Sequence, residues 1–245
     1  MKRSPQKAVH SKMLQIHEVF YTLQGEGPFI GHPAVFVRFT GCNLQCTWCD
    51  TEWDDDNDHS YTPCEVLHTI REVDPSRNAD LIVFTGGEPL RQDLTDVASV
   101  LLTAGFKIQV ETAGSYFQEW VNEDNVFVVI SPKTPKVNKQ WLEYPIEKSC
   151  WKYVIDNFKV SEEDGLPLRH PQPSNHLKQA PLQRPPTNAN VYVSVCDITE
   201  VAENRNRSRN LVNEEQQEMM LHTRDIALKH GHKFTMQLHK LLNIR

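Results

Sequence analysis

Short β-branched and aromatic runs alternate with stretches of helical periodicity from residue 81 onward, and this alternation constrains the fold more than any other feature. Two consecutive parallel strands need a long crossover connection, which is usually a helix. The order therefore favours an α/β fold with a parallel sheet, either open or rolled into a partial or full barrel. We expect strands at residues 15–22, 34–40, 81–85, 106–111, 126–131, 151–155, 191–195 and 234–238, and helices at 94–103 and 213–230.

The helix expected at 213–230 carries boundary signals at both ends. Asn213 is a favoured N-cap residue, Gln216 stands at the capping-box position, and Gly231 follows the last helical residue. These residue types satisfy the backbone groups that a helix leaves unpaired at its ends. The sequence therefore predicts where this helix begins and ends.

Polar or glycine-rich turns follow several of the expected strands. Gly86-Gly87 follows one strand, and Glu111-Thr112 lies at the end of the next. Ser131 and Cys196 lie at the ends of two later strands. The carboxyl ends of parallel strands meet at one edge of a sheet, where α/β folds bind their ligands. We expect these turns to form one mouth, together with the cysteine-containing loop that follows residues 34–40.

Cys42, Cys46 and Cys49 form a Cys-x3-Cys-x2-Cys motif on that loop. Three thiolates on a four-iron four-sulfur cluster leave one iron open to another ligand, so the spacing favours a catalytic cluster. A zinc site is the alternative, because a distant residue completes many zinc sites. The candidates for that fourth ligand are the eleven histidines, Cys64, Cys150 and Cys196.

The composition restricts partners and location. With 26 basic and 32 acidic residues the net charge is -6, so no nucleic-acid partner is expected. The longest apolar run, residues 126–130, is far shorter than a membrane span, and no signal-peptide core follows the basic N-terminus. Closely spaced cysteines favour metal binding in a reducing compartment, so we expect a cytoplasmic protein with no membrane attachment.

A length of 245 residues suits one domain, which we place at residues 13–245, and we expect residues 1–12 to be disordered. Six prolines lie among polar residues between positions 166 and 186. This composition is typical of irregular chain, so we expect a Pro-rich surface insertion at 161–189. A segment that docks a partner is the alternative.

The cysteine loop has Trp48 before its last cysteine, and the motif Thr85-Gly-Gly-Glu-Pro89 follows downstream. Together these motifs resemble those of the radical S-adenosylmethionine (SAM) superfamily. The resemblance implies a modified TIM-like partial (β/α) barrel, a four-iron four-sulfur cluster on the three cysteines, and SAM on its open iron. It also implies that Gly86 and Gly87 admit the methionine part of SAM, that Glu88 holds its ammonium group, and that Trp48 lies near the adenine. Direct ligation places the sulfonium against the cluster that reduces it. Other positions that match SAM contacts are Cys49, Asp50, Gly114, Ser131, Pro132, Lys133, Ser194, Val195, Cys196 and Asp197.

Motifs spread from residue 20 to the last residue narrow the resemblance to the 7-carboxy-7-deazaguanine synthases. They are Phe20-Tyr-Thr-Leu-Gln-Gly-Glu-Gly27, Arg38-Phe-Thr-Gly-Cys-Asn43, Cys49-Asp-Thr51, Glu111-Thr-Ala-Gly114, Ser131-Pro-Lys133 and Gln237-Leu-His-Lys-Leu-Leu-Asn-Ile-Arg245. That family converts 6-carboxy-5,6,7,8-tetrahydropterin to 7-carboxy-7-deazaguanine in queuosine biosynthesis, so the resemblance implies a lyase that releases ammonia. The pterin-binding residues that it implies are Leu23, Gln24, Gly25, Glu26, Arg38, Thr112, His239 and Arg245.

The same resemblance implies Mg²⁺ at Thr51, a homodimer, and an electron donor such as flavodoxin or ferredoxin. Arg38 suits the pterin carboxylate because its planar fork makes paired hydrogen bonds. Magnesium held by one hydroxyl takes its other ligands from substrate and water. A helix cap is the alternative role of Thr51. No protein nucleophile is needed, because the radical derives from SAM.

Two other functions stay open. A radical SAM activase that forms a glycyl radical on a partner protein shares the cysteine loop but has no need for the motifs near both ends of the chain. A zinc-stabilised binding module needs only the cysteines and one further ligand. Calcium binding at Asp54, Asp56, Asp58 and Glu65 is disfavoured, because His59 replaces the required glycine and Pro63 interrupts the run.

Overall fold

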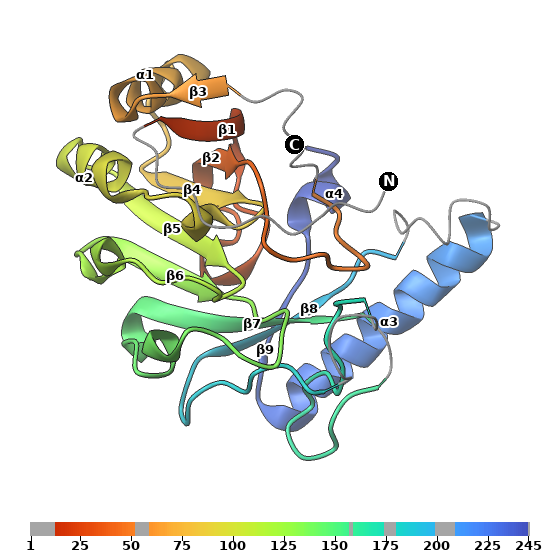
Figure 1. The fold of residues 1–245 in the computed structure, drawn as a ribbon. Helices are drawn as coiled ribbons and strands as arrows, with labels where there is room; N and C mark the ends of the chain where they lie inside the picture. The colour runs from red at the N-terminus through yellow and green to blue at the C-terminus, as the bar shows by residue number, and fades with distance from the viewer. Residues whose placement is uncertain (1–12, 52–58, 157–158, 174–179, 199–208, 245) are drawn as a thin grey trace.

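Figure 1 shows a computed structural model, which describes residues 13–51, 59–156, 159–173, 180–198 and 209–244. Residues 1–12, Asp54, Asp56, Asp58 and Arg245 lie outside the described residues. Within the described ranges the strands form one nine-stranded sheet in the order β3-β1-β2-β4-β5-β6-β7-β8-β9. The strands are β1 (Leu14–Leu23), β2 (Pro33–Phe39), β3 (His59–Tyr61), β4 (Leu81–Gly86), β5 (Lys107–Thr112), β6 (Val126–Ile130), β7 (Ser149–Ile155), β8 (Val191–Val195) and β9 (Lys233–Thr235).

The sheet combines two kinds of pairing. Strand β1 runs antiparallel to β2 and β3, whereas each neighbouring pair from β2 to β9 is parallel. Its edges are β3 and β9, which do not pair with each other, so the sheet remains open. The predicted α/β class and partial (β/α) barrel are confirmed.

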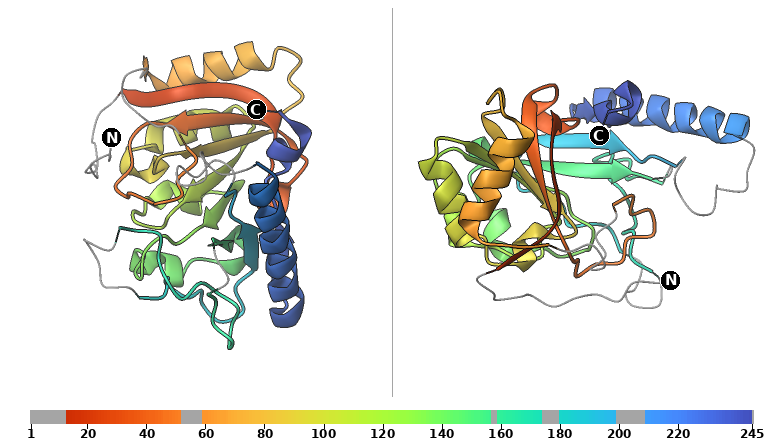
Figure 2. Two further views of the ribbon diagram at one scale, coloured as in Figure 1. Left: turned by 90° about the vertical axis from the view of Figure 1, so that its right-hand side faces the viewer. Right: turned by 90° about the horizontal axis from the view of Figure 1, so that it is seen from above.

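Helices α1 (Pro63–Val73) and α2 (Thr95–Thr103) pack side by side (Figure 1). Helix α3 (Arg209–His230), the long blue helix in both views of Figure 2, packs against β8 and β9, and α4 (Leu238–Leu242) follows β9. Helix α1 begins at a capping box, in which Glu65 N donates to Thr62 Oγ1 and Thr62 N donates to the Glu65 carboxylate. Short 3₁₀ turns lie at Gly27–Phe29, Pro89–Arg91, Glu119–Asn122, Lys139–Leu142 and Ile146–Lys148.

The core occupies both faces of the central strands. Phe39 of β2 and Phe84 of β4 belong to the main cluster, which also takes in buried side chains of α1 and α2. Ala34, Leu81 and Val83, on the opposite face of these strands, form a smaller buried cluster. Burial on both faces explains why these strands read as continuous apolar runs rather than as alternating patterns.

Several boundaries differ from the sequence prediction. The last strand ends at Thr235 rather than at residue 238, because Leu238 begins α4. Helix α3 begins at Arg209, four residues before Asn213, so Gln216 lies inside the helix and is not a capping residue. Its side chain accepts from Ile198 N at 2.9 Å and donates to Cys196 O at 3.1 Å. Strand β3 and helices α1 and α4 were not predicted.

The Pro-rich segment contains no helix or strand in its described part, but it is not confined to the surface. Leu166 and Leu182 are buried in the main cluster, and His170 and Gln172 are also buried. The carbonyl of Pro171 accepts from Thr47 N, in the cysteine loop, at 2.9 Å. The expectation of a surface insertion at 161–189 does not hold for these residues, because they pack on the core and on the cysteine loop.

The backbones of the cysteine loop and the Gly86-Gly87 turn are in direct contact. Gly87 N donates to Phe39 O at 3.1 Å, and Glu88 N donates to Gly41 O at 3.0 Å. Gly86 has a φ of +122°, and a Cβ there would overlap the carbonyl of Phe39. A Cβ on Gly87 would overlap the carbonyl of Gly41. Only glycine permits this approach.

We expect Gly86→Ala to lower the free energy of unfolding by more than about 2 kcal/mol, because a backbone overlap adds to the cost of a positive φ. Gly105→Ala is the matched control, since Gly105 has a φ of +91° but no atom within 4 Å of an added Cβ. That control should lose only about 1–2 kcal/mol. Urea unfolding of the apoproteins measures both, and equal losses would contradict the close approach.

Candidate active site

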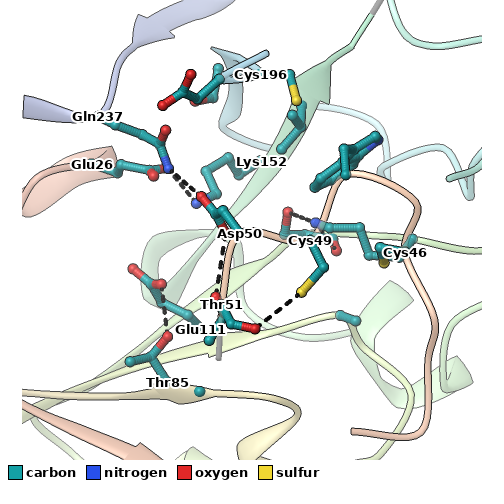
Figure 3. Close-up of a pocket in the computed structure, with 18 of the residues that line it drawn as sticks. Glu26, Cys46, Cys49, Asp50, Thr51, Thr85, Glu111, Lys152, Cys196 and Gln237 are labelled. Carbon is teal, nitrogen blue, oxygen red and sulfur yellow. Dashed lines mark hydrogen bonds and ion pairs between the residues drawn. The ribbon is translucent and has the colours of Figure 1, made fainter. Parts of the chain in front are cut away.

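A cavity of about 320 Å³ opens where the parallel strands end (Figure 3). Its walls come from β2, β4, β5, β7 and β8, from the residues that follow β1 and β6, from the cysteine loop, and from Gln237, His239 and Lys240. This volume is within the usual range of small-molecule sites. The predicted residues that line it are Gln24, Glu26, Arg38, Cys42, Cys46, Trp48, Cys49, Asp50, Thr51, Gly86, Gly87, Thr112, Ser131, Lys133, Ser194, Val195, Cys196, Asp197 and His239.

Other predicted residues lie behind the walls. Leu23, Gly25, Glu88, Gly114 and Pro132 do not line the cavity. Gly25 is packed against His239, whose ring an added Cβ would overlap, and Gly25 O accepts from Leu238 N at 3.0 Å. Gly25 therefore affects the cavity through His239, which lines it.

The cysteine loop presents three thiols with different surroundings. Cys42 and Cys46 are half-buried, and Cys49 is exposed. Burial raises the pKa of Cys42 to about 12, and the nearby Glu88 carboxylate adds to this shift. Burial raises the pKa of Cys46 to about 11, although the Lys133 ammonium opposes it. Iron binds thiolates, so ligation has to displace protons from both thiols.

The donor set of this loop fits a cluster better than a single ion. Among the residues that the structure describes, no three His, Cys, Asp or Glu side chains are close enough to share one metal ion. A four-iron cluster does not need such a point of convergence, because each of three irons takes one thiolate. Leu44 N donates to Cys42 Sγ at 3.4 Å, and Gln172 Nε2 donates to Cys46 Sγ at 3.2 Å. Both donors favour a negatively charged sulfur.

Glu88 supports the Gly86-Gly87 turn from behind. Its carboxylate accepts from the Thr112 hydroxyl at 2.7 Å, from Ala113 N at 2.8 Å and from Leu90 N at 3.2 Å. Burial outweighs these hydrogen bonds and raises the pKa of Glu88 to about 7. The carboxyl group is therefore poised to ionise at neutral pH when a cation arrives.

Trp48 forms an aromatic wall beside the last cysteine. Its Nε1 donates to Asp156 Oδ2 at 2.9 Å, and Lys133 Nζ lies 5.4 Å from the centroid of its ring. Lys133 Nζ also donates to Ser131 O at 3.0 Å. Burial raises the pKa of Asp156 and lowers the pKa of Lys133. The indole is thus held on its edge by a hydrogen bond and on its face by a cation.

Glu111 collects polar side chains on another wall of the cavity. Its Oε1 accepts from Gln24 Nε2 at 3.1 Å and from Gln109 Nε2 at 3.0 Å. Figure 3 shows its other contact, in which Oε2 accepts from the Thr85 hydroxyl at 3.3 Å. Gln109 is fully buried and Gln24 nearly so. These contacts fix the carboxylate in one orientation.

Glu26 and Lys152 form an ion pair at this wall, and their side chains are 14% and 11% exposed. Burial alone would raise the pKa of Glu26, but the Lys152 ammonium lowers it below its ordinary value. Burial alone would lower the pKa of Lys152, but the Glu26 carboxylate raises it. Removal of one partner from a buried pair costs about 3–5 kcal/mol, so each charge holds the other in place.

Arg38 is anchored from the neighbouring strand. Its Nε donates to Glu18 Oε1 at 2.7 Å, and its guanidinium carbon lies 5.6 Å from the centroid of the Phe20 ring. Both partners belong to β1, in which Glu18 is directly opposite Arg38. The planar group is therefore held at the cavity wall by register and stacking.

The C-terminal segment closes the cavity across from the strands. Gln237 Nε2 donates to Asp50 Oδ2 at 3.1 Å (Figure 3). Lys240 Nζ lies 2.6 Å from Asp197 Oδ2 and 3.5 Å from Asp50 Oδ2. His239 lines the cavity, and burial lowers its pKa. This segment thus connects the cysteine loop to the end of β8.

Some lining residues were missed, or were noted only within motifs: Phe36, Leu44, Thr85, Glu111, Lys152, Val154, Gln237 and Lys240. A signal existed for two of them. Glu111 ends a strand within a motif, and Lys152 interrupts an apolar strand in which it is buried. A charge in such a run needs a buried partner, so it was a candidate site residue.

An open partial barrel that holds a three-cysteine loop against a glycine turn at its strand ends defines a radical SAM domain. The Radical SAM superfamily model matches residues 36–167. The 7-carboxy-7-deazaguanine synthase of Rhodospirillum rubrum is 37% identical over 233 residues, which cover 94% of this chain and 92% of the relative. That of Rickettsia prowazekii is 31% identical over 241 residues, with 94% and 88% covered. The chain belongs to the 7-carboxy-7-deazaguanine synthase family.

A solved structure has the same fold. The crystal structure of QueE from Escherichia coli superposes with a TM-score of 0.59 at 22% identity and covers 93% of this chain and 95% of its own. No helix in the described ranges has the length and apolar character needed to cross a bilayer.

We expect the stability of the apoprotein to depend on pH through Glu88. Its pKa is 4.5 in the unfolded chain and about 7 in the fold, so between these values the unfolded chain ionises first. The free energy of unfolding should therefore fall by about 2–3 kcal/mol from pH 4.5 to pH 7, relative to Glu88→Gln. Urea unfolding at a series of pH values, with exposed Glu123→Gln as control, measures this. A constant difference between wild type and Glu88→Gln would contradict the assignment.

Proposed function

We propose that this chain converts 6-carboxy-5,6,7,8-tetrahydropterin to 7-carboxy-7-deazaguanine with loss of ammonia, in queuosine biosynthesis. The observation that carries the proposal is the cavity, in which the cysteine loop, the Gly86-Gly87 turn and residues 237–240 meet. A cysteine loop and glycine turn alone suit any radical SAM enzyme. Polar residues near both ends of the described chain, at 24–26 and 237–240, add walls that suit a heterocyclic substrate. The relatives, which are similar over nearly their full length, are 7-carboxy-7-deazaguanine synthases and support this substrate.

Cys42, Cys46 and Cys49 would hold the four-iron four-sulfur cluster, and SAM would lie against Gly86 and Gly87. When bound, the cluster and SAM together supply the one-electron chemistry that starts the reaction. The chain itself binds, orients and excludes water. Trp48 would supply an apolar face for the adenine, and residues 194–197 also line the cavity.

The pterin would lie against the polar wall. Gln24, Glu26 and Glu111 present oxygen acceptors for its ring N–H groups, and each is already oriented by another side chain or by the backbone. Acceptors that are already oriented lose little conformational entropy when they bind a ligand. Arg38 would pair with the carboxylate, and His239 would contact the ring from the C-terminal side.

Thr51 would provide the protein ligand of Mg²⁺. Its hydroxyl lines the cavity and lies 3.4 Å from Asp50 Oδ1. Magnesium retains several waters and binds substrate oxygens through few protein ligands, so a single hydroxyl is sufficient. The ion would then orient the pterin carboxylate. We further propose a cytoplasmic homodimer that receives electrons from a flavodoxin or a ferredoxin.

The direct test is anaerobic incubation of the reconstituted, reduced enzyme with SAM, Mg²⁺ and the carboxypterin. We expect 7-carboxy-7-deazaguanine by mass spectrometry, and none from Cys42→Ser, because three irons cannot then be held. Cys64→Ser is the control, since Cys64 is exposed at the start of α1 and should leave the yield unchanged. Cleavage of SAM by the wild-type enzyme without a deazapurine product would contradict the proposal.

Arg38→Lys tests the carboxylate contact in the same assay. Lysine keeps the charge but loses the planar fork and the contact of Nε with Glu18. We expect the KM for the pterin to rise about 10–100-fold, as expected for the loss of a charge-assisted hydrogen bond. The affinity for SAM, measured by calorimetry, should not change. An unchanged KM would remove Arg38 from the pterin site.

A further inference from the structure

Gln172 belongs to the Pro-rich segment, 126 residues after Cys46, yet its side chain lies against the cysteine loop. Its Nε2 donates to Cys46 Sγ at 3.2 Å and to Lys133 O at 3.3 Å. Its Oε1 accepts from Gln45 N at 2.9 Å. One amide group thus binds the cysteine, the residue before it, and the turn after β6.

The backbone next to Gln172 also binds the cysteine loop. Pro171 O accepts from Thr47 N at 2.9 Å, so residues 45 and 47 are both held by the Pro-rich segment. Gln172 lies between two prolines, whose fixed φ restricts the local backbone. Gln172 N also donates to His170 Nδ1 at 3.3 Å. The amide is therefore presented by a stiff piece of chain.

Burial makes the hydrogen bond to sulfur effective. Gln172 is 7% exposed and His170 is 4% exposed, so little water competes for the Gln172 amide. In such surroundings a donor stabilises negative charge on its acceptor more strongly than in water. Hydrogen bonds to ligand sulfurs are among the factors that set the reduction potential of an iron-sulfur cluster.

We propose that Gln172 is a positioning residue for the cluster. It fixes Cys46 in the loop, and its N–H group makes the bound cluster easier to reduce, because the reduced form carries one more negative charge. The proposal rests on ligation by Cys42, Cys46 and Cys49. It gives part of the Pro-rich segment a role at the active site.

Two variants separate the two contacts of Gln172, the donor contact with the Cys46 sulfur and the anchoring contact with Gln45 N. Gln172→Glu keeps the acceptor for Gln45 N but puts a carboxylate beside the sulfur, and Gln172→Leu removes both contacts. Gln183→Glu is the matched control, since Gln183 lies in the same segment and its Nε2 donates to Arg184 O at 3.0 Å. The ratio of reduced to oxidised cluster at fixed solution potential, without SAM, is measured by EPR-monitored titration.

We expect this ratio to fall about threefold in Gln172→Leu and about tenfold in Gln172→Glu, the latter equal to about 59 mV for one electron. Gln183→Glu should match the wild type. In the apoprotein, the backbone amide of Gln45 should exchange with deuterium several-fold faster in Gln172→Leu, because it loses its acceptor, which tests the anchor without any cluster.

A ratio within twofold of wild type in both Gln172 variants, with unchanged deuterium exchange at Gln45, would overturn the proposal. This failure is distinct from that of the ligation itself. If Cys42→Ser, Cys46→Ser and Cys49→Ser each keep four irons, the ligand assignment is wrong. If they lose iron while the potentials stay constant, only the role of Gln172 is wrong.

Discussion

The rest of the site depends on one backbone contact, between residues 39–41 and residues 86–88. Parallel pairing of β2 with β4 places Phe39 opposite Gly86, and two hydrogen bonds extend the pairing past the strand ends. Side chains at either glycine would separate the loops. Sheet register therefore determines how far the cysteines lie from the turn proposed to bind SAM, and no flexible side chain intervenes.

Around this contact the molecule orients polar groups through buried partners. Glu26 is held by Lys152, and Glu111 by Gln24, Gln109 and Thr85. Such networks are costly when incomplete and rigid when complete. The C-terminal segment adds contacts from Gln237 and Lys240 to Asp50, next to the last cysteine. The cysteine loop is thus supported from the sheet, from the C-terminal segment and from the Pro-rich segment.

Local signals in the sequence predicted the α/β class, most strands and the cysteine loop, because burial on both faces of parallel strands leaves continuous apolar runs. A local pattern can also predict the wrong role. Gln216 has the spacing of a capping-box residue, but its side chain binds the backbone of residues 196 and 198. Glu65, in the true capping box with Thr62, was considered only with the acidic run before it. The contact of Gln172 with Cys46 depends on the tertiary path of an irregular segment, which no periodicity encodes.

Cys42, Cys46 and Cys49 are proposed to leave one iron of the cluster open beside the Gly86-Gly87 turn. Mössbauer spectroscopy of the enzyme reconstituted with isotopically labelled iron, recorded with and without SAM, tests it most directly. We expect one iron in four to change its signal when SAM is added, because only that iron lacks a thiolate. Four irons that respond alike, or that do not respond at all, would contradict it.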